Sequence, residues 1–133
     1  MLVRDCMTKK VETVGPNDAL VTAEDVMRLG RIRHMPVVDE GELVGLVSQR
    51  DLFHSALVKA LGFGTHATQK ARETMLVKEA MTSDVTTTTP DTPLADAARL
   101  MLDRKIGCLP VVENKKLVGI LTEADFVKLA IKR

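Results

Sequence analysis

Much of the architecture of this protein can be read from one segment, Met35-Pro36-Val37-Val38-Asp39-Glu40-Gly41-Glu42-Leu43-Val44-Gly45-Leu46-Val47-Ser48-Gln49-Arg50-Asp51. The chain contains it again, 74 residues later, as Leu109-Pro110-Val111-Val112-Glu113-Asn114-Lys115-Lys116-Leu117-Val118-Gly119-Ile120-Leu121-Thr122-Glu123-Ala124-Asp125. Both versions place two apolar, β-branched runs around a four-residue polar turn, which predicts a β-hairpin. Both continue with a hydroxyl side chain and, three residues on, an aspartate, which is typical of a helix start.

The repetition continues upstream, so that residues 3–53 align with residues 77–127 without a gap. A period of this length is too long for a solenoid and indicates a duplicated small domain. Because a unit of about 50 residues buries little surface on its own, we expect the two copies to share one core. The predicted organisation is a first domain at 1–60, a helical connector at 61–76 and a second domain at 77–133.

Each copy is predicted to fold in the order β-α-β-β-α, which gives an α/β (α+β) protein with two similar halves. The expected elements of the first copy are a strand at 11–14, a helix opened and capped by Pro16-Asn17-Asp18 and ending near Gly30, hairpin strands at 35–38 and 43–47, and a helix after Ser48. The second copy repeats them, with a strand at 85–88 and a first helix that follows Pro90-Asp91-Thr92 and ends near Lys105.

The composition argues against several classes of function. With 19 basic and 18 acidic residues, the chain has no net field to attract nucleic acid or a membrane surface. The first residues lack a secretory signal pattern, and no apolar run approaches the roughly 18–20 residues of a membrane span, so we expect a cytoplasmic location. Cys6 and Cys108 occupy non-equivalent places in the repeat and are expected to be reduced and partly buried, with a disulfide or metal pair as the alternative.

Taken in order, these features resemble the CBS domain, named for cystathionine β-synthase, and in particular the tandem pair called a Bateman module. The resemblance covers nearly the whole chain. It rests on the openings Met7-Thr8 and Met81-Thr82, the proline that starts the first helix, the Pro-Val-Val strand and the Gly-x-x-(Ser/Thr)-x-x-Asp motif. It implies an α/β sandwich with two clefts related by a pseudo-two-fold axis. It also implies that AMP, ADP, ATP or S-adenosylmethionine binds as a regulatory ligand, with no cofactor required.

The motif residues Ser48 and Asp51, repeated as Thr122 and Asp125, have two interpretations. The structural one is a capping box, in which hydroxyl and carboxylate satisfy the free N–H groups of a helix start. In the functional one, these N–H groups and the hydroxyl hold a phosphate, and the carboxylate accepts hydrogen bonds from the ribose hydroxyls. The resemblance favours ribose binding by both aspartates.

The resemblance further implies that the opening strand of the opposite copy contributes the adenine-binding wall of each cleft. The expected ligand-binding groups are Thr82, Val85 and Thr87 with Ser48 and Asp51, and Thr8, Val11 and Thr13 with Thr122 and Asp125. Because Trp and Tyr are absent, aliphatic contacts and backbone hydrogen bonds would hold the base. The alternative for Val11 and Val85 is an ordinary place in the core.

The copies differ just before the proline of the repeated segment, where Arg33-His34 in the first corresponds to Gly107-Cys108 in the second. In proteins resembling this pattern, basic residues at this point contact nucleotide phosphates. Arginine offers a fixed, planar charge, and His34 could gain a proton beside a phosphate. The alternative is a solvated arginine and a partly buried histidine. We therefore expect unequal clefts, with phosphorylated ligands preferring the one that contains Asp51.

These features predict an adenosine-nucleotide-binding regulatory module, not an enzyme, that signals to a separate effector protein. The alternative is a structural protein-interaction pair that binds no ligand. An enzyme has less support, because no GxSxG, HExxH or Walker motif occurs. The resemblance also implies a homodimer formed through helices, and the apolar residues expected at its interface are Leu52, Phe53, Leu57, Val58, Phe126, Val127 and Ala130.

Overall fold

The computed structural model describes residues 1–53 and 74–132. The chain divides into two compact units: unit 1 contains Met1–Val11, Gly41–Leu43 and Val85–Arg133, and unit 2 contains Glu12–Glu40 and Val44–Asp84. The units do not coincide with the sequence repeats, because the opening residues of each copy belong to the unit that holds the hairpin of the other copy. The predicted connector at 61–76 lies largely outside the described residues, and the predicted domain boundaries remain a prediction.

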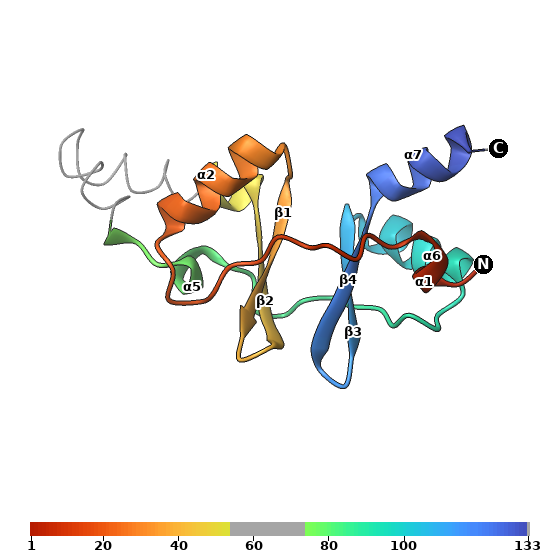
Figure 1. The fold of residues 1–133 in the computed structure, drawn as a ribbon, viewed down its shortest axis with the longest axis horizontal. Coiled ribbons are helices and arrows are strands. Elements are labelled where there is room, and N and C mark those ends of the chain that lie inside the picture. Colours follow the sequence, from red (N-terminus) through yellow and green to blue (C-terminus); the bar gives the residue numbers. More distant parts are fainter. Residues whose placement is uncertain (54–73, 133) are drawn as a thin grey trace. The chain divides into compact units, whose positions relative to one another are not determined.

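Unit 2 contains α2 (Leu20–Gly30), β1 (His34–Asp39), most of β2 (Glu42–Ser48) and α5 (Val77–Ala80), and residues 49–53 are helical. Figure 1 shows α2 beside the β1–β2 hairpin. The buried side of α2 consists of Leu20, Ala23 and Met27, which recur at helical spacing as predicted. The core of the unit consists of Val14, Leu20, Ala23, Met27, Met35, Val37, Val47, Leu52, Met75 and Val77.

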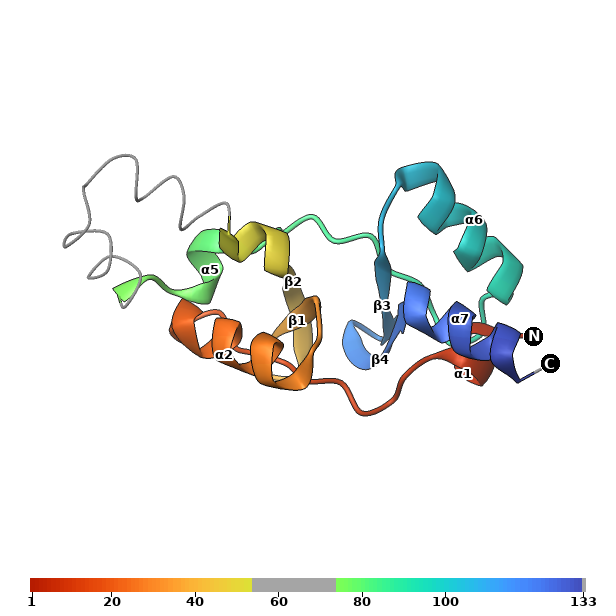
Figure 2. The ribbon, with the colours of Figure 1, turned by 90° about the horizontal axis from the view of Figure 1, so that it is seen from above.

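Unit 1 contains α1 (Val3–Cys6), α6 (Leu94–Arg104), β3 (Cys108–Glu113), β4 (Lys116–Thr122) and α7 (Glu123–Ile131). The predicted hairpin is confirmed by β3 and β4, which pair antiparallel with the fully buried Leu109 opposite Leu121. Figure 2 shows α1 next to α6 and α7, and α1 contacts both helices. The core of the unit consists of Val3, Leu94, Ala97, Met101, Leu109, Val111 and Leu121.

The buried residues differ from the single shared core that we expected. Among the described residues they form two clusters, one in each unit. Each cluster nevertheless draws on both sequence copies, because Val77 belongs to the core of unit 2 and Val3 to that of unit 1. Both valines are fully buried. A single copy would lack this part of its core, which is a physical reason for the domain to occur as a pair.

The first helix of each copy ends where the sequence predicts, near Gly30 and Lys105, but the predicted caps at the helix starts are wrong. Neither α2 nor α6 has a side-chain cap. The N–H of Leu20 instead donates to the carbonyl of Met75 at 2.8 Å, and the N–H of Leu94 donates to that of Met1 at 2.9 Å. A carbonyl from the opening segment of the other copy therefore satisfies each helix start, which local sequence patterns cannot reveal.

Instead of the strands expected at 11–14 and 85–88, each segment forms a single isolated β-bridge. Val14 bridges Val37, and Thr88 bridges Val111, both in parallel. Two residues further along the chain, at the next position that faces the same neighbouring strand, each copy has a proline. Proline has no N–H to donate, so the ladder ends after one residue.

The opening segment of each copy contains a one-turn helix, α1 or α5, that the sequence analysis did not predict. The carboxylate of Asp5 accepts a hydrogen bond from the N–H of Leu2 at 2.8 Å, and that of Glu79 accepts one from Leu76 at 2.9 Å. Each pair is half of a capping box. An acidic residue three positions after a leucine, present in both copies, was the available signal.

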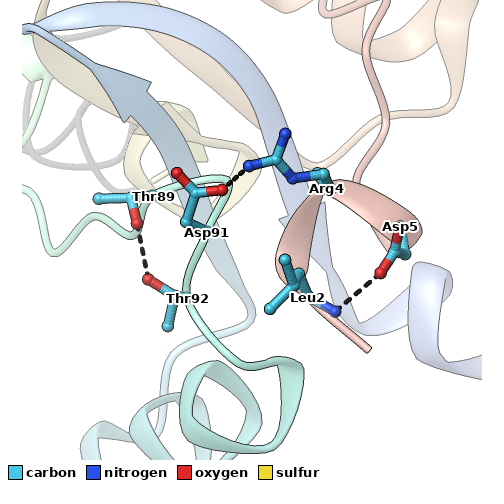
Figure 3. A network of polar contacts seen from close by, with 6 residues as sticks. All are labelled: Leu2, Arg4, Asp5, Thr89, Asp91 and Thr92. Carbon is cyan, nitrogen blue, oxygen red and sulfur yellow. Dashed lines mark hydrogen bonds and ion pairs between the residues drawn. The ribbon is translucent and has the colours of Figure 1, made fainter.

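Polar contacts hold the opening segment of unit 1 against the turn at 89–92 (Figure 3). The N–H of Val3 donates to the carbonyl of Thr92 at 2.9 Å, and the N–H of Arg4 donates to that of Pro90 at 3.0 Å. The guanidinium of Arg4 also forms an ion pair with Asp91. Because this ion pair is largely exposed, it contributes at most about 1 kcal/mol. The buried side chain of Val3 is therefore the main anchor of the segment.

Both hairpins close through two-residue turns rather than the four-residue turns that we expected. The turn residues are Glu40 and Gly41, with φ of 51° and 83°, and Asn114 and Lys115, with φ of 52° and 68°. Positive φ at both positions is the type I′ geometry, which matches the twist of paired strands.

Among residues 1–53 and 74–132, no helix combines the length and the apolar character that a membrane crossing requires. The helices α2 and α6 have 11 residues each, against about 20 for a spanning helix.

Candidate functional site

The repeated hydroxyl–aspartate motif lies where the second hairpin strand of each copy passes into a helix. In unit 1, β4 ends at Thr122 and α7 begins with the next residue, which puts Asp125 in its first turn. In unit 2, β2 ends at Ser48, and Asp51 lies in the helical residues 49–53. The strand fixes the position of the hydroxyl residue, and the first helical turn brings the aspartate back toward it.

In unit 1 the aspartate is buried and both carboxylate oxygens accept hydrogen bonds. Asp125 is only 5% exposed. Its Oδ2 accepts from the backbone N–H of Thr122 at 2.8 Å and from the Thr122 hydroxyl at 3.2 Å. Its Oδ1 accepts from the hydroxyl of Thr8 at 2.9 Å. Three donors thus compensate the burial of this carboxylate, which would otherwise be costly.

Backbone pairing brings Thr8 to Asp125. The N–H of Thr8 donates to the carbonyl of Ile120, and the N–H of Ile120 donates to the carbonyl of Thr8, both at 2.9 Å. A Cβ at Gly119 would lie 2.7 Å from the Sδ of Met7 and 3.0 Å from the carbonyl oxygen of Thr8. The glycine of the motif is therefore required for the opening segment to lie close against β4.

In unit 2 the equivalent aspartate, Asp51, is half-buried and has fewer hydrogen-bond partners among the described residues. Its Oδ2 accepts from the N–H of Ser48 at 3.1 Å, and the Ser48 hydroxyl oxygen accepts from the N–H of Asp51 at 3.0 Å. Within residues 1–53 and 74–132, Oδ1 of Asp51 has no hydrogen-bond partner. Thr82, the counterpart of Thr8, pairs with Leu46 through its backbone but is itself exposed. No residue in the described ranges therefore occupies this second carboxylate oxygen.

Arg33 and His34 adjoin the helix start of unit 2. The N–H of Gln49 donates to the carbonyl of Arg33 at 2.9 Å, and β1 begins at His34. Arg33 is exposed and His34 is half-buried. In unit 1 the N–H of Glu123 donates in the same way to Gly107 at 3.3 Å. Because the first N–H of each helix is already used, phosphate binding by free N–H groups has less support than we expected.

The other residues predicted to form adenine-binding walls are divided between the units. Val11 belongs to unit 1, with Asp125, whereas Thr13 belongs to unit 2, and Val85 and Thr87 belong to unit 1. Thr13 is exposed and the other three are half-buried. Neither valine is a member of a buried cluster, which argues against an ordinary place in the core. Their role as adenine contacts stays a prediction.

Cys6 lies at the Asp125 site, which sequence reasoning missed because the residue has no counterpart in the other copy. Its thiol donates to the backbone carbonyl of Asp125 at 3.6 Å. Burial, and then the negative charge of Asp125, raise the pKa of the Cys6 thiol. Burial raises the pKa of Cys108 to about 12. Both cysteines are free, as predicted, and as protonated thiols they are poor nucleophiles at neutral pH.

Comparison with known proteins identifies relatives over the whole described fold. The CBS domain model matches residues 3–57 and 77–132. A CBS domain-containing protein of Bacillus subtilis (strain 168), YhcV, is 32% identical over 124 residues, which cover 92% of this chain and 81% of that protein. The CBS domain pair of protein MJ0100, solved in complex with 5′-methylthioadenosine and S-adenosyl-L-methionine, is 30% identical with a TM-score of 0.79, covering 100% of this chain and 98% of that one. CBSX2 in complex with AMP is 33% identical with a TM-score of 0.80, covering 99% and 98%.

Several curated relatives are much longer than this chain. It spans 24% of a homoserine O-acetyltransferase from Methanococcoides burtonii, for example, at 35% identity over 129 residues. The two family matches nevertheless cover most of this chain, at the two places where its sequence repeats. The chain therefore belongs to the CBS domain family and carries the domain twice.

Proposed function

We propose that this protein is a regulatory module that binds an adenosine nucleotide and signals to a separate partner protein, rather than an enzyme. The observation that carries the proposal is Asp51, a half-buried aspartate in the family motif with one carboxylate oxygen that no described residue occupies. The two hydroxyls of a ribose are donors, and an ionised carboxylate is an acceptor suited to both. Two related CBS pairs support this ligand class, one solved with 5′-methylthioadenosine and S-adenosyl-L-methionine and the other with AMP.

The choice among adenosine compounds would depend on Arg33 and His34. Arg33 is exposed and adjoins the helix start of the Asp51 site, where its fixed charge favours a phosphate. A protonated His34 would add a second positive charge beside the same phosphate. AMP, ADP and ATP are therefore the expected ligands. S-adenosylmethionine has no phosphate and offers Arg33 only its single carboxylate, which is balanced by an ammonium group, so it would depend mainly on Asp51.

Added nucleotide should stabilise the folded protein. A ligand at about 100 times its dissociation constant contributes roughly 2.7 kcal/mol, which for a chain of this size is a rise in melting temperature on the order of 10 °C. Differential scanning calorimetry with AMP, ATP and S-adenosylmethionine measures this rise, and GMP is the matched control for the base. If no adenosine compound at millimolar concentration shifts the melting temperature, the proposed function is wrong.

We also propose that the protein forms a homodimer through α6 and α7. An apolar cavity of about 490 Å³ lies at these helices, and its lining includes Ala98, Met101, Ile106, Phe126, Lys105 and Glu123. Three large apolar side chains on the same helices are exposed, namely Leu102 (78%), Val127 (60%) and Ile131 (78%). In a two-fold dimer this face meets itself, so that Lys105 of one copy can approach Glu123 of the other. The opposite charges favour a second copy as the occupant.

The residues that the sequence analysis expected at a dimer interface differ in their exposure. Val127 and Ala130 are exposed, and Phe126 is half-buried and lines the cavity. Phe53 is 70% exposed on unit 2. The prediction that Leu52 lies at the interface is wrong, because Leu52 is 6% exposed and belongs to the core of unit 2. The remaining two residues, Leu57 and Val58, lie outside the described part of the chain.

A glutamate at position 102 should separate the dimer into monomers. Leu102→Glu puts a carboxylate into the contact surface, and burying an unpaired charge costs several kcal/mol. Light scattering on the wild-type protein and the variant gives the molecular mass directly. Leu29→Glu is the matched control, because Leu29 is 81% exposed on α2 of the other unit. A monomeric wild-type protein, or a variant that stays dimeric, would contradict the proposed interface.

A second candidate function is a protein-interaction pair that binds no ligand. The observation in its favour is the Asp125 site, where Thr8 and Thr122 already occupy both carboxylate oxygens. Asp51 argues the other way, and binding of any adenosine compound decides between the two. Either proposal includes a cytoplasmic location, where free thiols such as those of Cys6 and Cys108 stay reduced.

A further inference from the structure

The two copies of the motif use their aspartates differently. Asp125 is 5% exposed, and its Oδ1 accepts from the hydroxyl of Thr8 at 2.9 Å. Asp51 is half-buried, and its Oδ1 has no partner among the described residues. Thr82, the counterpart of Thr8, is exposed and forms no side-chain hydrogen bond within residues 1–53 and 74–132. The difference between the two sites therefore centres on the hydroxyl of Thr8.

We propose that Thr8 determines the ligand selectivity of the Asp125 site, because its hydroxyl occupies the carboxylate oxygen that a ribose hydroxyl would use. The inference rests on the proposed function, in which ribose hydroxyls bind these aspartates. Asp125 is 5% exposed and the Thr8 hydroxyl lies directly against its Oδ1, so a ribose hydroxyl reaches this oxygen only by displacing Thr8, and the diol adds little to affinity. At Asp51 a ribose hydroxyl displaces no donor from the described residues, and this site selects ligands that carry the diol.

The backbone around Thr8 makes this competing hydroxyl hard to displace. Thr8 and Ile120 exchange two backbone hydrogen bonds at 2.9 Å, and Met7 packs against Gly119. The side chain therefore projects from a fixed position, and only rotation about χ1 removes the hydroxyl from Asp125 while the backbone pairing persists. Such a rotation leaves the buried Oδ1 without its donor, which opposes the change.

The test measures adenosine binding by the full chain with Asp51→Ala, with and without Thr8→Val. Valine keeps the shape of threonine and lacks the hydroxyl, so Oδ1 of Asp125 becomes available. Calorimetry should then show that adenosine binds at least about ten times more tightly, because one hydrogen bond to a charged group is worth about this factor. The affinity for 2′-deoxyadenosine should change by less than about twofold. Thr8→Ser keeps the hydroxyl and should behave like the parent.

Two results would overturn the proposal. The first is an equal affinity for adenosine with and without Thr8→Val, including no binding by either protein. The second is an equal gain in affinity for adenosine and 2′-deoxyadenosine. A second measurement leaves Thr8 intact, in case Thr8→Val does not fold. The ratio of adenosine to 2′-deoxyadenosine affinity should be near one in Asp51→Ala and about ten or more in Asp125→Ala. A large ratio in Asp51→Ala also overturns the role of Thr8. Failure of the proposed function differs, because the wild-type protein would then bind no adenosine compound.

Discussion

Replacing Asp51 by alanine should weaken AMP and ATP binding by about a hundredfold or more. Hydrogen bonds to a charged group are worth roughly 1.5–3 kcal/mol each, and a ribose can donate two of them to this carboxylate. The fold should lose much less, about 1 kcal/mol, because among the described residues the carboxylate accepts only from the N–H of Ser48, at the helix start. Isothermal titration calorimetry and urea unfolding measure the two effects separately.

The phosphate part of the same site is tested by Arg33→Ala. This substitution should weaken ATP binding about tenfold or more, through the loss of a charge-assisted hydrogen bond, and leave adenosine binding nearly unchanged. Arg28→Ala is the matched control, because Arg28 is also exposed in unit 2 and pairs with Asp25 on its own helix. If Arg33→Ala affects no phosphorylated ligand, or if Asp125→Ala damages nucleotide binding more than Asp51→Ala, the assignment of the phosphate site is wrong.

The parts of the fold that the sequence predicts correctly are those set by local patterns. The hairpin strands follow from the β-branched runs, and the buried face of α2 follows from the helical spacing of Leu20, Ala23 and Met27. Local patterns do not predict the exchange of opening segments, because it depends on contacts between residues far apart in the chain, and only the family resemblance placed the opening residues of one copy at the motif of the other. The hydrogen bond from the N–H of Leu94 to the carbonyl of Met1 is the clearest case.

The candidate site shows the same division. The motif alone predicts that a hydroxyl and an aspartate meet at each helix start, since the spacing of a capping box is local. Grouping Thr8 with Asp125 anticipated their proximity, but the sequence does not reveal that the hydroxyl of Thr8 binds the carboxylate. Nor does it distinguish a buried Asp125 from a half-buried Asp51, because both copies carry the same motif. The expected inequality of the sites rested on Arg33 and His34, and Thr8 supplies an independent reason for it.

Asp125→Ala should affect stability far more than ligand binding. It leaves the Thr8 hydroxyl and the Thr122 N–H, both part-buried, without their acceptor, and a donor left unsatisfied away from water costs up to about 1–3 kcal/mol. We therefore expect a loss of about 2–4 kcal/mol in the free energy of unfolding, a large part of the roughly 5–15 kcal/mol typical of a folded domain.

Urea unfolding of Asp125→Ala and Asp51→Ala at one fixed protein concentration provides the comparison, since the stability of a dimer depends on concentration. Asp125→Asn is the conservative control. It keeps one carbonyl oxygen as an acceptor but puts an amide group, itself a donor, opposite the remaining donors, so its loss of stability should fall between those of the alanine variant and the wild type.

Asp51 has one described donor and Asp125 has three, so Asp125→Ala should unfold at a clearly lower urea concentration than Asp51→Ala. Equal midpoints for the two variants would mean that the hydrogen bonds from Thr8 and Thr122 do not stabilise unit 1, and the structural role of Asp125 would have to be abandoned.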